Sequence, residues 1–159
     1  GVAPSLIVFS LFKEMDYSGA MESLAGVFPY LAFLLSVFSA LRLAKFNNDT
    51  RQTSSFVGLP VPANALFWAS LVTGAHDWLV SSNFHPVYLL LLVCLFSWLL
   101  VSEIPMFSLK FKNLSWKDNK TSFIFLLVCI PFLIFLGICS FSAIIVWYIL
   151  LSLITRKSK

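Results

Sequence analysis

The chain has 159 residues, of which 59% are hydrophobic, 16% aromatic and 11% charged, with a net charge of +4 and a mean hydropathy of +0.90. Soluble domains contain about 25% charged and about 45–50% apolar residues, so a soluble fold of this length has too little interior for these side chains. We therefore expect an integral membrane protein: an all-α polytopic bundle of transmembrane helices that forms one domain over residues 1–159.

The apolar segments predict the helices in chain order. A bilayer span needs roughly 20 apolar residues, with a range of about 17–25. The sequence predicts an N-terminal helix stub at residues 1–12 and five complete spans, at residues 25–45, 62–80, 86–102, 121–138 and 141–155. Only a short run around Gly137 separates the last two, so one long bent helix is the alternative for 121–155.

The basic residues orient these spans. Cytoplasmic loops are enriched in Lys and Arg, and of the 11 basic residues only Lys13 lies on one side of the predicted membrane. The other side holds the 42–61 hairpin, the 103–120 loop and the C-terminus, which we expect to be cytoplasmic together with residue 1. Topology and attraction to anionic lipid explain the positive charge, so we expect no nucleic-acid partner.

The end of the 25–45 span carries an unusual polar edge. Small residues recur at every fourth position, which lets helices approach closely in lipid; they are Ala32, Ser36, Ala40 and Ala44. Ser39, Arg42 and Lys45 follow at intervals of three residues and form one polar edge near the cytoplasmic end.

Two interpretations of these cations stay open. Both side chains can simply snorkel to the membrane surface and follow the positive-inside rule. Alternatively they form an anion site, because a guanidinium binds phosphate through two parallel hydrogen bonds. In that case Arg42, Lys45 and Asn47 are the candidate substrate-binding residues.

The segment "GLPVP" at residues 58–62 predicts a stiff loop leading into the next span. Gly58 permits unusual backbone dihedrals, and Pro60 and Pro62 fix φ and remove hydrogen-bond donors. We expect these three residues to shape a rigid floor at the membrane surface, although a proline is also common in the first turn of a helix.

Other chemistry-bearing residues form no recognisable catalytic set. His76 and His85 lie on the opposite side from the basic hairpin, and we expect structural or interfacial roles for them. The three cysteines, Cys94, Cys129 and Cys139, lie in apolar runs without metal-ligand spacing, so we interpret them as small hydrophobic residues.

Four segments, taken in order, carry a resemblance to a known family. "GVAPS" at 1–5, "ALRLAKFN" at 40–47, "GLPVP" at 58–62 and "VSEIPMFSLK" at 101–110 resemble the bacterial phosphatidylserine synthases of the CDP-alcohol phosphatidyltransferase family. The resemblance covers nearly the whole chain, and the run from 40 to 62 is its specific part. The family often has arginine where this chain has Lys45.

The family signature is absent from residues 1–159. That signature, D-G-x-x-A-R-x(8)-G-x-x-x-D-x-x-x-D, supplies aspartates that hold a divalent metal, Mg²⁺ or Mn²⁺, and activate the attacking hydroxyl. No Asp-Gly pair occurs in the sequence. The resemblance implies that Gly1 follows shortly after the signature, that two helices precede it, and that Pro4 and Ser5 shape the metal helix. No metal ligand or catalytic residue is therefore expected in this fragment.

The resemblance implies an activity and a location. The expected enzyme transfers the phosphatidyl group from CDP-diacylglycerol to L-serine in the bacterial inner membrane, with its active site facing the cytoplasm. The chain by itself is expected to be inactive. Two alternative functions are left open: a sister phosphatidyltransferase that uses another alcohol, and a transport or structural membrane protein. The expected partners are CDP-diacylglycerol, L-serine and membrane lipids, and a homodimer is also left open.

Overall fold

The fold was analysed in a computed structural model, which describes residues 1–17, 19–48, 56–106 and 120–156. The expected loops at 42–61 and 103–120 therefore lie partly outside the described residues. The elements, in chain order, are α1 (Val2–Glu14), η1 (Gly19–Leu24), α2 (Phe28–Leu31), α3 (Leu34–Asn48), β1 (Phe56–Val57), α4 (Val61–Val80), α5 (Pro86–Val101), β2 (Pro105–Met106), α6 (Lys120–Leu136), η2 (Gly137–Cys139) and α7 (Ser140–Arg156).

The described fold is helical, as predicted, except for one pair of two-residue strands. Phe56 pairs with Met106 and Val57 with Pro105 in an antiparallel arrangement. The predicted stub at 1–12 continues to Glu14. The predicted span at 25–45 is divided at Ala32 and Phe33, where i→i+3 backbone hydrogen bonds tighten the turn between α2 and α3.

Membrane crossing is supported by length and apolarity for two stretches of the described residues, Phe28–Asn47 and Lys120–Thr155. The helix Pro86–Val101 is apolar but shorter. Five complete spans are therefore more than this criterion shows, and that count stays a prediction.

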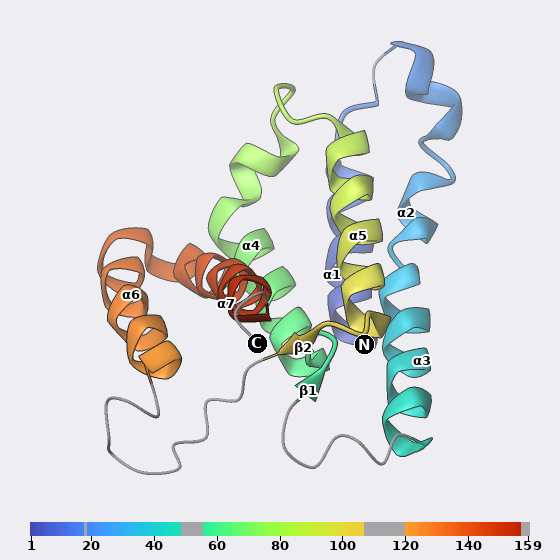
Figure 1. Ribbon diagram of the computed structural model, residues 1–159. Helices are drawn as coiled ribbons and strands as arrows, with labels where there is room; N and C mark the ends of the chain where they lie inside the picture. Colours follow the sequence, from blue (N-terminus) through green and yellow to red (C-terminus); the bar gives the residue numbers. More distant parts are fainter. Residues whose placement is uncertain (18, 49–55, 107–119, 157–159) are drawn as a thin grey trace.

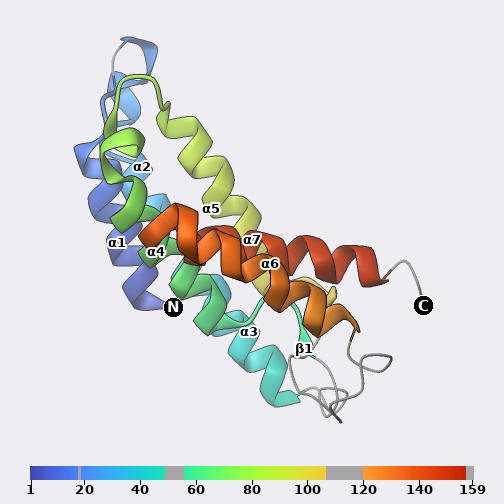
Figure 2. The same cartoon turned by 90° about the vertical axis from the view of Figure 1, so that its left-hand side faces the viewer.

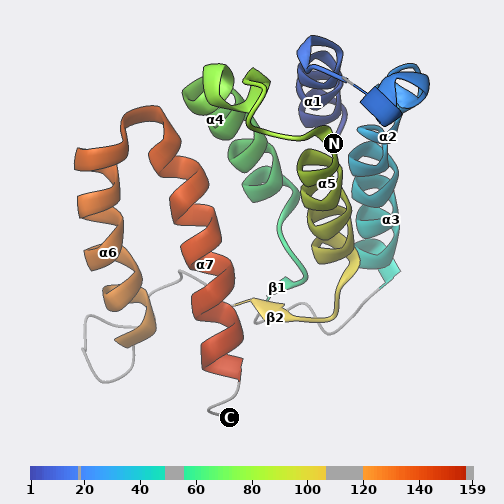
Figure 3. The same ribbon diagram turned by 90° about the horizontal axis from the view of Figure 1, so that it is seen from above.

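The stretch from 120 to 155 forms a helical hairpin. Gly137 has φ +54°, a left-handed conformation that few residues other than glycine adopt readily, and it opens the short η2 between α6 and α7. The two helices run side by side in opposite directions (Figure 3). Two helices folded back on each other, rather than one long bent helix, therefore describe this part of the chain.

The remaining helices form a bundle to which this hairpin is attached. Helix α3 packs on α5, and α1 packs on both α3 and α4 (Figure 1). Helix α7 packs on α4 and crosses the bundle, as the second view shows (Figure 2). Helix α6 packs mainly on α7. The side chains on its outer face are exposed, with Phe135 82% and Ile134 71% exposed.

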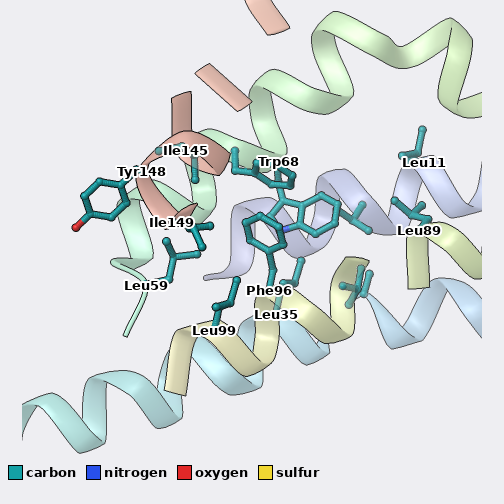
Figure 4. Close-up of a cluster of buried hydrophobic side chains, with 14 of the residues drawn as sticks. Leu11, Leu35, Leu59, Trp68, Leu89, Phe96, Leu99, Ile145, Tyr148 and Ile149 are labelled. Carbon is teal, nitrogen blue, oxygen red and sulfur yellow. The ribbon is translucent and has the colours of Figure 1, made fainter. Parts of the chain in front are cut away.

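A buried cluster joins α1, α3, α4, α5 and α7 (Figure 4). Trp68 is fully buried at its centre, with its ring centroid 5.6 Å from that of Phe96 in an edge-to-face arrangement. Phe67 stacks on Phe96 at 4.0 Å. In a bilayer, where lipid is as apolar as these side chains, close van der Waals packing and polar contacts, rather than exclusion from water, hold helices together.

The α4–α7 contact shows this close approach. Ser142 Oγ donates to the Phe67 carbonyl at 3.0 Å and also bonds the Ser70 hydroxyl. A Cβ at Gly74 would lie 2.9 Å from the backbone nitrogen of Cys139. The seam between the bundle and the hairpin therefore depends on small side chains and hydroxyl contacts.

Several chain segments meet at one end of the bundle, here called the β1–β2 end. The strands, the start of α1 and the end of α5 lie there (Figure 1). At the opposite end, Glu14 Oε2 of α1 lies 2.9 Å from His76 Nε2 of α4. The end of α1 and the second half of α4 thus lie away from the strands, and the side of a membrane that each end faces stays a prediction.

Candidate functional site

The polar edge of α3 begins where it meets α1. Ser5 Oγ lies 2.7 Å from Ser36 Oγ, and both hydroxyls donate to the Gly1 carbonyl, at 3.0 and 3.3 Å. A Cβ at Gly1 would lie 2.7 Å from Ser39 Cβ. The first turn of α1, which includes the buried Pro4, is therefore fixed against α3.

Arg42 lies one turn further along the same edge and is half-buried. Within the described residues, Arg42 Nε and Ser39 Oγ are both buried and have no hydrogen-bond partner. Tyr148 of α7 lies close enough to Arg42 to interact with it electrostatically. Buried polar atoms without partners are uncommon in native proteins, so this place is suited to a polar ligand.

Lys45 is already engaged by protein groups. Its Nζ donates to the Val101 carbonyl at 3.2 Å and lies 3.1 Å from Glu103 Oε1. A cation is favourable beside the carbonyl end of a helix, and here it joins the end of α3 to the end of α5. Both side chains are partly exposed: 40% of the Lys45 side chain and 68% of the Glu103 side chain are accessible to solvent.

Asn47 is not brought together with Arg42. It is exposed near the end of α3. Five residues at about 100° each place it roughly 140° around the helix from Arg42. Of the three predicted substrate-binding residues, Arg42 and Lys45 therefore share an edge and Asn47 lies on another face.

The loop after β1 is clamped onto the end of α5. Gly58 has φ +74°, its nitrogen donates to the Ile104 carbonyl at 2.9 Å, and Leu59 N donates to the Leu99 carbonyl at 2.9 Å. A Cβ at Gly58 would lie 2.8 Å from the carbonyl oxygens of Leu100 and Ser102. Only glycine fits this close approach without moving backbone atoms.

The two prolines of this loop begin α4. Pro60 precedes the helix with φ −60° and ψ 135°, and its carbonyl accepts a hydrogen bond from Asn64 N at 3.0 Å. Pro62 occupies the first turn, where a missing N–H costs nothing. Both prolines thus direct the chain from the clamped loop into the helix.

The sequence pattern missed two residues of this end, Glu103 and Tyr148. Glu103 lies within the family-like run at 101–110 and beside the basic segments, which was a usable signal. Tyr148 lies in an apolar run, where nothing in the sequence distinguishes it from a packing residue.

The histidines make local contacts at the opposite end. Besides the contact with Glu14, His76 Nδ1 lies 3.5 Å from Asp77 Oδ1, and His85 Nδ1 accepts from Val87 N at 3.5 Å at the start of α5. These contacts agree with the predicted structural and interfacial roles. No group of three His, Cys, Asp or Glu suited to a metal occurs among the described residues.

Comparison with known proteins gives the relatives of the chain. It matches no protein-family model. It is 30% identical to the CDP-diacylglycerol–serine O-phosphatidyltransferase of Bacillus subtilis over 104 residues, which are 65% of this chain and 49% of that protein. It is 29% identical to the enzyme of the same name from Helicobacter pylori strain 26695 over 172 aligned positions, which cover all of this chain and 67% of that protein.

The chain is therefore a distant homologue of phosphatidyltransferases. The relatives in question are bacterial CDP-diacylglycerol–serine O-phosphatidyltransferases, which agrees with the resemblance drawn from the four segments. The match spans about half of the length of the first relative and about two thirds of the second.

Proposed function

We propose that the complete protein transfers the phosphatidyl group of CDP-diacylglycerol to L-serine, giving phosphatidylserine and CMP. The serine hydroxyl oxygen attacks the phosphorus of the phosphatidyl group, the P–O bond to CMP breaks, and the hydroxyl loses its proton. The single observation that carries the proposal is the half-buried Arg42, whose Nε has no described hydrogen-bond partner, in a distant homologue of enzymes with this name.

Arg42 is the proposed contact for phosphate or for the serine carboxylate. A guanidinium can form two parallel hydrogen bonds to either group, and Ser39 Oγ beside it is a second buried atom without a partner. A preorganised cation of this kind stabilises the negative charge that develops on the phosphoryl oxygens. The expected place of the reaction is the cytoplasmic surface of the bacterial inner membrane.

A divalent metal, Mg²⁺ or Mn²⁺, is the cofactor implied by the resemblance. The described residues do not fit one, because the carboxylate at the β1–β2 end, Glu103, stands alone and no group of three suitable ligands occurs. We assign no metal ligand among them and derive no step through a metal.

The substitution Arg42→Lys tests the proposal in the complete gene product. It keeps the charge but removes the two-pronged geometry, and losing a charge-assisted contact lowers kcat/KM roughly ten- to hundred-fold. The measurement is serine-dependent CMP release in detergent, after membrane insertion has been checked. If Arg42 only snorkels, lysine serves equally well, and unchanged turnover contradicts the assignment.

Lys45→Arg is the matched control. Arginine also reaches the Val101 carbonyl and Glu103, so we expect activity near that of the original protein. A sister enzyme with another acceptor is recognised in the same assay, because CMP release then depends on an alcohol other than serine.

A further inference from the structure

Glu103 differs from the other described carboxylates in its location. Glu14, Asp16, Glu22 and Asp77 lie on α1, on α4 or in the segment that follows α1, towards the opposite end of the bundle. Of the carboxylates in the described part of the chain, Glu103 alone lies at the β1–β2 end, 3.1 Å from Lys45 Nζ. Among the residues that the structure describes, the region proposed to bind substrate therefore presents one negative group beside its cations.

The backbone on both sides of Glu103 is fixed. Ser102 Oγ donates to the Leu99 carbonyl at 2.9 Å, and the Ile104 carbonyl accepts from Gly58 N at 2.9 Å. Ser102 and Ile104 are buried, whereas 68% of the Glu103 side chain is exposed. The fold thus holds this carboxylate on a rigid support and leaves it accessible to a solute.

The charges of this pair match those of an amino acid. L-serine carries an ammonium and a carboxylate on the same carbon atom, so recognition of both groups needs a carboxylate and a cation close together. Lys45 and Glu103 offer such a pair. An exposed ion pair contributes little to stability, so a ligand can separate its members without disrupting the fold.

We propose that Glu103 binds the ammonium group of the acceptor, while Lys45 and Arg42 face its carboxylate or the phosphate of the donor. This inference rests on the proposed function and adds the residue that selects the acceptor. Glycerol phosphate and inositol phosphate carry a phosphate and no ammonium. Glu103 repels such acceptors, and repulsion of the wrong ligand is a common source of specificity.

The substitution Glu103→Gln in the complete gene product tests this role. It keeps the size and the hydrogen-bonding oxygen but removes the charge that attracts an ammonium. We expect KM for serine to rise roughly ten- to hundred-fold, as for loss of a charge-assisted contact, while KM for CDP-diacylglycerol and kcat stay within about two-fold. Glu22→Gln, an exposed carboxylate away from the β1–β2 end, is the matched control and leaves all constants unchanged.

A serine analogue distinguishes direct binding of the ammonium group by Glu103 from an indirect role in which Glu103 only positions Lys45. 3-Hydroxypropionate is serine without its amine, and as a competitive inhibitor it should bind the Glu103→Gln variant at least as well as the original protein. Equal increases in KM for serine and for CDP-diacylglycerol would show that Glu103 merely positions Lys45, and unchanged constants would show that it binds nothing; either result overturns the inference. Absence of serine-dependent CMP release from the original protein overturns the proposed function itself.

Discussion

Replacing Gly58 with alanine changes one methyl group at the point where the loop before α4 is clamped onto α5. Gly58 has φ +74°, and the added Cβ would lie 2.8 Å from two backbone carbonyl oxygens, those of Leu100 and Ser102. Real Cβ atoms essentially never approach this closely. Because the obstacles are backbone atoms of a helix end, the loop rather than α5 must move.

The size of the effect follows from two contributions. A left-handed conformation costs an alanine about 1–2 kcal/mol. Movement of the loop breaks the hydrogen bonds from Gly58 N and Leu59 N to α5 and its following residues, each of which contributes about 0.5–1.5 kcal/mol. The free energy of unfolding should therefore fall by about 2–5 kcal/mol, which lowers Tm by roughly 5–20 °C for a chain of this size.

The assay is thermal unfolding of the detergent-solubilised protein, followed by loss of the monodisperse elution peak after heating. Gly26→Ala is the matched control, since nothing lies within 4 Å of a Cβ at Gly26 and no positive φ is required there. We expect the Gly26→Ala variant to unfold at the same temperature as the original protein. If Gly58→Ala unfolds at the same temperature as Gly26→Ala, the described clamp does not support the fold.

Three further predictions concern the seam, the topology and the chain itself. Gly74→Leu should lower Tm because a Cβ already meets the backbone of Cys139, and Cys139→Ala should not restore it since the backbone nitrogen remains at 2.9 Å; full rescue would refute this reading. An impermeant maleimide applied to intact cells should label a cysteine at Ser82 and not one at Thr53, which lies outside the described residues; the reverse pattern would invert the topology. A protein limited to residues 1–159 should release no CMP with CDP-diacylglycerol, serine and Mg²⁺ or Mn²⁺, and release above background would show that the active site has been misplaced.

The helices were predictable because their signal is local. Apolar runs gave the positions of α4, α5, α6 and α7 to within a few residues. The topology drawn from the charges stays a prediction. The pairing of β1 with β2 was not predictable, since Phe56 and Met106 are far apart in sequence and two residues are too few for a periodic pattern. The break between α2 and α3 was missed because Ala32 and Phe33 are compatible with a continuous helix.

The candidate site was predictable in part for the same reason. Spacing along one helix placed Arg42 and Lys45 on a common edge with Ser39, and the structure has this arrangement. The partners of that edge come from other helices: Glu103 follows α5, and Tyr148 lies in α7. A period of 3.6 residues carries no information about which distant segment faces a helix, so these contacts required the fold.

The clamp between the GLPVP loop and α5 has a consequence for biogenesis. The acceptors of the loop, the carbonyls of Leu99 and Ile104, lie some forty residues after the donors Gly58 and Leu59 and leave the ribosome only after both α4 and α5 have been made. Until then Gly58 N and Leu59 N lack these partners, and Lys45 lacks both the Val101 carbonyl and Glu103. The β1–β2 end, which engages three separate segments, is therefore assembled late: the surface proposed to receive the substrates forms only after α3, α4 and α5 have all been synthesised.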